Sequence, residues 1–312
     1  MRAIVFDRNG GPEVLEPREL ADPVPAADQV LVEVEAIGVN YRDVYEREGN
    51  GYGTPAPAII GIEGAGTVVG TGERVAWASV AGSYAERVAA ARGRLVSIPD
   101  GVATDVAAAV ILQGLTAHYL AFDSFAIAEG DWVLVHAAAG GVGLLLTQIA
   151  RLRGGRVIAT TSTGEKAELA LAAGAEVVIA YEGFAERVRE VTGGAGVAAV
   201  YDGIGATTFQ EGLRALAPTG SMILYGAASG NPEPLELYSL ATAGSLYVQR
   251  PTLQTYARTP ELLSARAELL FGMVADGSLH VRIGGRYPLE DARRAHEDLE
   301  SRSTTGKLLL VP

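Results

Sequence analysis

The residues whose types and spacing most clearly indicate chemistry lie between 136 and 143, in the run His-Ala-Ala-Ala-Gly-Gly-Val-Gly. In the dinucleotide-binding pattern Gly-x-Gly-x-x-Gly, Ala138, Gly140 and Gly143 take the three glycine positions, so the first departs to alanine. Gly140 would let the backbone approach a pyrophosphate, and Gly143 would let the following helix pack closely on the preceding strand. The N–H groups that begin this helix would then bind phosphate. A strand before the turn and a helix after it favour a dinucleotide site over an ordinary tight turn.

The end of the next predicted strand indicates which dinucleotide is bound. A site for NAD carries Asp or Glu there, which binds the 2′-hydroxyl of the ribose. This strand instead ends in Ala-Thr-Thr-Ser at Ser162, the first acid is Glu165, and Lys166 follows it. Hydroxyl groups with a nearby cation suit a 2′-phosphate and therefore favour NADPH. The alternative for Lys166 is a solvated surface side chain.

Composition excludes several kinds of chemistry. The 312 residues include no cysteine, which rules out disulfides, thiol nucleophiles and thiolate zinc sites, and the four histidines show no ligand spacing. A formal net charge of −12 disfavours binding to nucleic acid or to an anionic membrane surface. The N-terminus lacks the apolar core of a signal peptide, and glycines interrupt the apolar stretch 132–150. We therefore expect a soluble, cytoplasmic protein that binds no nucleic acid and no membrane.

The elements that must position these residues change in character along the chain. About the first 110 residues predict strands, at 30–39, 61–69 and 74–78, and then a helix at 103–112 with Thr104 as its N-cap. After Gly114, strands are predicted at 132–136, 156–161, 177–180, 198–202 and 221–225, with helices between them. This alternation predicts a parallel sheet covered by helices on both faces. The last part predicts helices at 260–276 and 291–301 and strands at 281–287 and 307–311.

A second set of regularly spaced residues lies in the glycine- and tyrosine-rich connection 36–66. The pattern Ala-x-Gly-x-Asn-x-x-Asp-x-x-x-Arg-x-Gly is met by Ala36, Gly38, Asn40, Asp43, Arg47 and Gly49. The pattern Pro-x-x-x-Gly-x-Glu-x-x-Gly is met by Pro57, Gly61, Glu63 and Gly66. Through these patterns, the turn at 139–143 and the segments 201–209, 224–230, 249–256 and 295–312, the whole chain resembles the zinc-free NADPH:quinone oxidoreductases (zeta-crystallin group) of the medium-chain dehydrogenase/reductase superfamily.

The resemblance implies an α/β fold in which a doubly wound Rossmann domain is inserted into a GroES-like, partly open β-barrel. The catalytic domain would comprise residues 1–114 and 251–312, and the Rossmann NADPH-binding domain residues 115–250. It also implies a homodimer joined through the strand near 246–248. Zinc-dependent relatives use Cys and a His-Glu pair as ligands, but here Ile62 precedes Glu63. We therefore expect no metal, and direct hydride transfer to an acceptor that is already electrophilic.

The resemblance also implies which residues act on the acceptor. Asn40, Asp43 and Tyr45 would line the cleft where the nicotinamide meets the acceptor, with Asn40 and Tyr45 also contacting the cofactor, and Tyr52 would close over the acceptor. Asn40 or a tyrosine hydroxyl would stabilise the developing oxyanion. The alternative for Asp43 is a structural carboxylate that orders the loop or pairs with Arg47.

The remaining predicted site residues would bind NADPH at the carboxyl ends of the Rossmann strands. The pyrophosphate would lie on Ala139, Gly140, Gly141, Val142 and Gly143, and the ribose 2′-phosphate near Ser162, Lys166 and Tyr181. The nicotinamide half would lie near Gly205, Ala206, Tyr225, Gly226, Ala227, Ala228, Arg250, Pro251 and Thr252. The alternative for Tyr181 is a core aromatic residue, and for Arg250 a structural ion pair.

Three functions agree with these residues. The first is an NADPH-dependent quinone reductase. The second is an alkenal, enone or enoyl reductase with the same cofactor, which only the acceptor pocket would distinguish from the first. The third is an NADPH-binding sensor without turnover. The acceptor in the first two is a small molecule, either a quinone or an enone.

Overall fold

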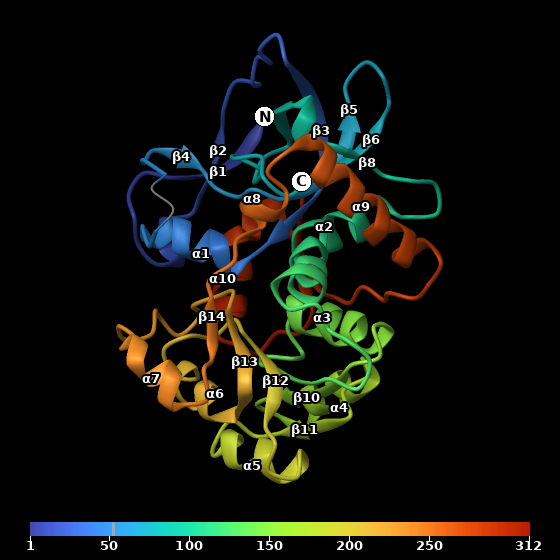
Figure 1. The fold of residues 1–312 in the computed structure, drawn as a ribbon. Coiled ribbons are helices and arrows are strands. Elements are labelled where there is room, and N and C mark those ends of the chain that lie inside the picture. The colour runs from blue at the N-terminus through green and yellow to red at the C-terminus, as the bar shows by residue number, and fades with distance from the viewer. Residues whose placement is uncertain (52–53) are drawn as a thin grey trace. The chain divides into compact units, whose positions relative to one another are not determined.

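The computed structural model describes residues 1–51 and 54–312, which pack into two units (Figure 1). The first unit is formed by both ends of the chain, Met1–Leu115 and Tyr256–Pro312, and the second by Thr116–Thr255. The boundaries expected from the sequence lie at 114/115 and 250/251.

The first unit is built mainly from antiparallel strands in two sheets. The smaller sheet has the order β2-β1-β4, and the larger has the order β15-β16-β3-β5-β6-β8, with β7 also paired to β3. The strands are β1 (Arg2–Phe6), β2 (Glu16–Glu19), β3 (Gln29–Val39), β4 (Ala58–Ile59), β5 (Gly64–Val68), β6 (Arg74–Trp77), β7 (Arg87–Ala91), β8 (Val96–Ser97), β15 (Ile283–Pro288) and β16 (Lys307–Val311). Because β16 pairs with β3, the C-terminal strand completes the sheet begun by the N-terminal part.

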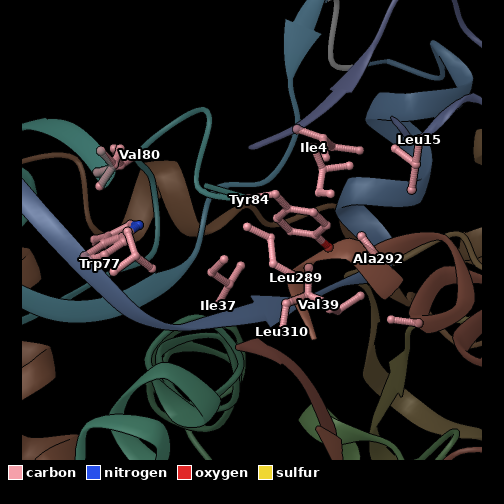
Figure 2. Close-up of a cluster of buried hydrophobic side chains, with 14 of the residues drawn as sticks. Ile4, Leu15, Ile37, Val39, Trp77, Val80, Tyr84, Leu289, Ala292 and Leu310 are labelled. Carbon is pink, nitrogen blue, oxygen red and sulfur yellow. The ribbon is translucent and has the colours of Figure 1, made fainter. Parts of the chain in front are cut away.

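The core of this unit lies between the two sheets and two segments from the C-terminal part. It includes Ile4 of β1, Ile37 of β3, Trp77 of β6 and Leu310 of β16. Figure 2 shows the ring of Tyr84 inside this cluster. The helices of the unit are α1 (Tyr41–Glu48), α9 (Pro260–Ala275) and α10 (Ala292–Glu300), with the one-turn segments η1 (Pro12–Val14), η2 (Arg92–Arg94) and η4 (Leu289–Asp291).

Two helices differ from the sequence-based expectation. The helix predicted at 103–112 extends over Thr104–Tyr119 (α2) and continues as a π-helical turn, η3 (Leu120–Ser124), so Thr104 is its first residue and not its N-cap. Gly114 lies inside α2 and does not end it. A Cβ there would lie 2.7 Å from Leu270, so the glycine allows close packing. Helix α1 was expected to be a connection, but Arg42 and Glu46 pair one turn apart within it and Gly49 ends it at a φ of +79°.

The segment Thr104–Ser124 is also long and apolar enough to cross a membrane by length and composition alone. However, 72% of its most apolar window is buried inside the protein. Buried apolar helices of this kind are common in the cores of soluble proteins.

The second unit contains a six-stranded parallel sheet with the order β11-β10-β9-β12-β13-β14. The strands are β9 (Trp132–Val135), β10 (Arg156–Thr160), β11 (Val177–Ile179), β12 (Val197–Asp202), β13 (Leu216–Leu224) and β14 (Tyr247–Gln249). The helices are α3 (Gly141–Leu152), α4 (Gly164–Ala172), α5 (Phe184–Val191), α6 (Phe209–Ala215), α7 (Leu237–Thr242) and α8 (Leu253–Tyr256).

The order of these strands defines where a ligand can bind. In chain order the sheet runs third, second, first, fourth, fifth, sixth, which confirms the predicted doubly wound sheet. Figure 1 shows α3 and α4 on one side of it and α6 and α7 on the other. The direction of the chain across the sheet reverses between β9 and β12, and ligands of such sheets bind beyond the carboxyl ends of the strands at this reversal.

Candidate functional site

The turn between β9 and α3 is shaped by its backbone. A Cβ on Gly143 would lie 2.4 Å from the carbonyl oxygen of Ala137 and 2.7 Å from Cα of Ala138, so only glycine fits there. Gly140 is the N-cap of α3, and no side chain caps this helix. Its first N–H groups therefore remain for a ligand, and together with the helix dipole they favour an anion. This geometry fits the pyrophosphate of a dinucleotide.

Aromatic side chains support the turn from the neighbouring strands. The hydroxyl oxygen of Tyr181 accepts a hydrogen bond of 3.0 Å from the N–H of Ala137, a residue with a φ of +49°. The ring of His136 stacks on Tyr181 at 6.0 Å, and His136 Nδ1 lies 2.8 Å from Oγ1 of Thr160. Burial lowers the pKa of His136 to about 4, so this imidazole is neutral at pH 7. Sequence reasoning named Tyr181 but not His136, which gave no signal beyond its place at the end of an apolar strand.

The residues after β10 belong to the start of α4. Ser162 is exposed, and Thr163 caps α4 by accepting a 3.3 Å hydrogen bond from the N–H of Lys166. Lys166 is half-buried in the first turn of this helix. Since β10 pairs with β9, Ser162 and Lys166 lie at the same edge of the sheet as the glycine turn.

A buried carboxylate connects the ends of β12 and β13. One oxygen of Asp202 accepts hydrogen bonds from the N–H groups of Ile204 (2.7 Å) and Gly205 (3.1 Å), and the other accepts one from the Thr208 hydroxyl (2.8 Å). The carbonyl of Asp202 also accepts a 2.8 Å hydrogen bond from the N–H of Tyr225. Asp202 thus orders the two predicted cofactor segments, yet sequence reasoning did not single it out.

The other predicted cofactor residues also follow strands of this sheet. Arg250 follows the edge strand β14 and donates a 2.7 Å hydrogen bond to the carbonyl of Leu224, at the end of β13. Pro251 is buried and Thr252 is exposed. The structure therefore brings one group of predicted residues to the carboxyl edge of the sheet: Ala139, Gly140, Gly141, Val142, Gly143, Ser162, Lys166, Tyr181, Gly205, Ala206, Tyr225, Gly226, Ala227, Ala228 and Arg250.

In the first unit, a buried ion pair surrounds the side chain of Asn40. The ammonium of Lys307 pairs with Glu63, and the two side chains are 1% and 0% exposed. The second carboxylate oxygen of Glu63 accepts a 2.7 Å hydrogen bond from the N–H of Leu112. Gly38 makes room for this pair, because a Cβ there would lie 2.1 Å from Glu63 Oε2 and 2.7 Å from Cε of Lys307.

The amide of Asn40 is fully occupied by this arrangement. Its Nδ2 donates to Glu63 Oε2 (2.7 Å) and to the carbonyl of Gly38 (3.2 Å). Its Oδ1 accepts from Lys307 Nζ (2.7 Å) and from Nε2 of Gln113 (3.4 Å). Both amide hydrogens are therefore used inside the unit, and binding an oxyanion would require one of these bonds to break. Of the two oxyanion donors expected from the sequence, this favours a tyrosine hydroxyl.

Asp43 belongs to a second buried network. Its Oδ2 accepts 3.0 Å hydrogen bonds from the N–H of Asn40 and from the hydroxyl of Tyr84. Asp43 has no exposed surface, and this burial raises its pKa to about 7. Arg47 pairs with Glu300 at 2.7 Å and lies 3.1 Å from Nδ1 of His296. Asp43 thus orders this segment, as its alternative structural role requires. It does not pair with Arg47, whose partner is Glu300.

The predicted tyrosines are placed only in part. Tyr45 is half-buried on α1, with its ring 6.2 Å from that of Tyr41. Tyr52 lies outside the described residues. Sequence reasoning missed Tyr84, Gln113, His296 and Lys307 in these networks. A lone lysine before an apolar run was the only available signal for Lys307.

Within residues 1–51 and 54–312, no group of three or more His, Cys, Asp or Glu side chains is placed to hold a metal ion. Glu63, which follows Ile62, instead binds the ammonium of Lys307. These donors do not make a zinc site of the tetrahedral kind.

Comparison with known proteins agrees with both units. Residues 26–100 match the family model of the alcohol dehydrogenase GroES-like domain, and residues 141–268 match that of zinc-binding dehydrogenases. The chain is 42% identical to a quinone oxidoreductase of Pseudomonas aeruginosa, over 100% of this chain and 99% of the relative. It is 36% identical to a 2-haloacrylate reductase of a Burkholderia species, over 99% and 98%. The crystal structure of Escherichia coli quinone oxidoreductase complexed with NADPH matches with a TM-score of 0.97 and 39% identity over the full length of both chains.

A GroES-like domain completed by the C-terminal strands, together with a doubly wound nucleotide-binding sheet, defines a medium-chain dehydrogenase/reductase. This confirms the fold expected from the sequence. Within that superfamily, the chain belongs to the quinone oxidoreductase family.

Proposed function

We propose that this protein is an NADPH-dependent quinone reductase that needs no metal. The observation that carries the proposal is the similarity to quinone oxidoreductases over the full length of both chains. The glycine turn supports it, since its free N–H groups and its clearance at Gly143 suit a dinucleotide. The acid expected for NAD is missing after β10, where Ser162 and Lys166 suit a 2′-phosphate.

Bound NADPH supplies a hydride, and the residues of this chain bind and orient the reactants. Ala139–Gly143 hold the pyrophosphate, and Ser162, Lys166 and Tyr181 hold the adenosine ribose with its phosphate. Asp202 keeps the segments at Gly205 and Tyr225 in place for the other half of the cofactor. All of these residues belong to the second unit.

On the acceptor side, a quinone needs less activation than a ketone. Its conjugated ring delocalises the negative charge that hydride addition creates, so one hydrogen-bond donor suffices in place of a Lewis acid. We assign that donor to Tyr45, with Tyr52 as a second candidate, and both are carried over from the family resemblance. Asn40 and Asp43 then hold the segment that carries Tyr45.

Steady-state oxidation of NADPH and NADH tests this proposal. The acceptors are 1,4-benzoquinone, 9,10-phenanthrenequinone and an α,β-unsaturated ketone, with EDTA present throughout. We expect turnover of quinones with a strong preference for NADPH and no effect of the chelator. Tyr45→Phe should lower kcat, and Tyr287→Phe serves as the control for loss of a hydroxyl. Tight NADPH binding with no turnover of any acceptor would contradict the enzyme proposal and favour an NADPH-binding sensor.

A second candidate function is the reduction of an activated alkene. The observation that favours it is the 36% identity to a 2-haloacrylate reductase. Hydride addition to a conjugated alkene also leaves an oxyanion, so the same donor serves both reactions. Turnover of the unsaturated ketone alone would favour this candidate over quinone reduction.

The assembly is a homodimer joined through β14 in this proposal, and the protein is soluble and cytoplasmic. Strand β14 is an edge of the parallel sheet, and Tyr247 and Val248 on it are exposed. Such an edge requires cover, which a second copy provides. Tyr247→Lys should shift the mass measured by light scattering from dimer to monomer, whereas Tyr238→Lys on α7 tests the neighbouring exposed surface.

A further inference from the structure

A chain of polar side chains, all but the first of them buried, runs from Glu300 of helix α10 to the N-terminus of α1. Glu300 pairs with Arg47, Arg47 lies 3.1 Å from His296 Nδ1, His296 Nε2 lies 3.1 Å from the Tyr84 hydroxyl, and this hydroxyl lies 3.0 Å from Asp43. The partners come from distant parts of the sequence, and Arg47, Asp43, Tyr84 and His296 have no exposed surface.

From Arg47 onward in this series of side chains, each hydrogen bond is donated by the residue farther from Asp43 to the residue nearer to it. A guanidinium can only donate, so His296 Nδ1 must accept from Arg47. Burial and the nearby Arg47 lower the pKa of His296 to about 3, so its ring is neutral and carries its one hydrogen on Nε2. Nε2 then donates to the oxygen of Tyr84, which leaves the hydroxyl hydrogen of Tyr84 to donate to Asp43.

Packing fixes the ring of Tyr84. Gly61 has a φ of +93°, and a Cβ there would lie 2.1 Å from Cδ1 of Tyr84. Figure 2 shows Ile4, Leu289 and Ala292 around the ring in the core cluster. The His296 ring meets Tyr84 edge to face at 5.8 Å. The hydroxyl of Tyr84 therefore has one position, and that position faces Asp43.

The two oxygens of Asp43 differ. Oδ2 accepts from Asn40 and Tyr84, whereas Oδ1 is buried without a hydrogen-bond partner among the described residues. A proton taken up by Asp43 would go to Oδ1, and the neutral acid would hold both donors less strongly. The charged or titratable groups that act on Asp43 or Tyr84 are Arg42, Glu46, Glu63, His296 and Lys307.

Helix α1 depends on Asp43 for its starting point. Asn40, its N-cap, is held through its main chain by Asp43 and through its side chain by Glu63 and Lys307. Tyr45 follows on the same helix, little more than one turn beyond Asn40. A change at Asp43 therefore shifts or loosens the segment that carries Tyr45.

We propose that Tyr84 is a positioning residue for quinone reduction, which holds ionised Asp43 and through it the start of helix α1, with His296 and Arg47 directing its hydroxyl. This inference rests on the proposed function. The residues of the chain Glu300–Arg47–His296–Tyr84 then act on the reaction without touching substrate or cofactor.

Tyr84→Phe tests this inference, with Tyr287→Phe as the matched control. Tyr287 also donates to a carboxylate, Asp298 at 2.8 Å, in the same unit but outside the chain that reaches Asp43. In the wild type we expect kcat to fall below about pH 7 as Asp43 takes up a proton. Because the Tyr84 hydroxyl lowers the pKa of Asp43, Tyr84→Phe should move this fall upward by about one pH unit. Asp43→Asn should remove it, and Tyr287→Phe should leave it in place.

Two results would overturn the inference. One is a Tyr84→Phe profile that matches that of Tyr287→Phe, with only thermal stability lowered. The other is an unchanged fall in kcat in Asp43→Asn.

Unfolding measurements keep the test separate from the proposed function. The pKa of Asp43 is raised from 3.8 to about 7 in the folded protein, so its contribution to stability is greatest below pH 3.8 and is lost as pH rises to about 7. Asp43→Asn should therefore gain stability relative to the wild type over this range, and Tyr84→Phe should extend the loss to higher pH. If no quinone is reduced, the proposed function fails. The unfolding measurements still show whether Tyr84 lowers the pKa of Asp43.

Discussion

The two units prepare their functional residues by opposite means. In the second unit the backbone shapes the turn: a Cβ would not fit at Gly143, and no side chain caps the N–H groups at the start of α3. In the first unit, side chains form the network: Glu63 and Lys307 bind the amide of Asn40. Asp43, which accepts from Tyr84, also accepts from the N–H of Asn40. A backbone site is sensitive to added volume, whereas a network of buried polar groups is sensitive to any partner left unpaired.

Glycine serves both units, but for different neighbours. A Cβ at Gly143 would meet backbone atoms that cannot move away. At Gly38 and Gly61 it would meet the side chains of Glu63, Lys307 and Tyr84. Gly38 and Gly61 thus make room for side chains in the first unit, whereas Gly143 makes room for main chain in the second.

The largest effect is expected from Lys307→Met, which breaks the side-chain network of the first unit. The variant leaves the carboxylate of Glu63 buried without its cation, and breaking a buried pair in this way costs about 3–5 kcal/mol of unfolding free energy. Urea unfolding followed by circular dichroism measures the loss. The matched control is Arg293→Met, since Arg293 pairs with Glu297 at the surface and should change stability by less than about 1 kcal/mol.

The double variant Glu63→Gln, Lys307→Met sharpens this result. Because neither side chain of the buried pair then carries a charge, the double variant should recover much of the stability that Lys307→Met alone loses. A double variant as unstable as the sum of the two single variants would mean that packing around these side chains, and not their pairing, stabilises the unit.

Gly143→Val tests the backbone-built unit by adding volume. Its side chain would enter the space occupied by Ala137 and Ala138, so the turn must open and the pyrophosphate cradle is lost. We expect NADPH to bind at least about 100-fold more weakly, or roughly 2.7 kcal/mol, by fluorescence titration. Gly164→Ala is the control: Gly164 also lies in the first turn of a helix, but a Cβ there meets nothing within 4 Å. Equal losses in both variants would contradict the role given to the turn.

The contrast between the units also explains what the sequence could predict. The glycine turn, its strand and its helix lie within about 20 residues, so spacing alone indicates their arrangement. The strand at 307–311 was predicted with the bounds that the structure has. Each of these features depends on neighbours in the sequence, which local patterns describe well.

The networks of the first unit could not be predicted in this way. Tyr84 and His296 lie 212 residues apart, and Lys307 and Asn40 lie 267 apart, so no local pattern connects them. Helix α1 was missed although it carries local signals, since Arg42 and Glu46 pair one turn apart and Gly49 ends it. What lies beyond local reach is the contact of its Asp43 with Tyr84, which comes from the loop between β6 and β7. The motif residues Gly38, Asn40, Asp43 and Arg47 could be named, but what each one contacts required the fold.

The smallest effect is expected from Lys166→Met, which removes a side chain from the backbone-built site. If the pyrophosphate is held by main chain, NADPH should lose only about tenfold in affinity, or roughly 1.4 kcal/mol, and NADH should lose none. Calorimetric titration of both cofactors measures the difference. Arg187→Met, on the exposed surface of α5 in the same unit, should change neither affinity.

Lysine chemistry gives a second test of this role, because Lys166 and Lys307 are the only lysines in the sequence. Lys307 is buried, with 1% of its side chain exposed, so an amine-selective reagent applied to the folded protein should modify Lys166 and the N-terminus. NADPH at saturation should protect Lys166 but not the N-terminus, and NADH should protect it less, because it lacks the 2′-phosphate. Equal protection by the two cofactors would remove Lys166 from phosphate binding and leave the second unit selective through its backbone alone.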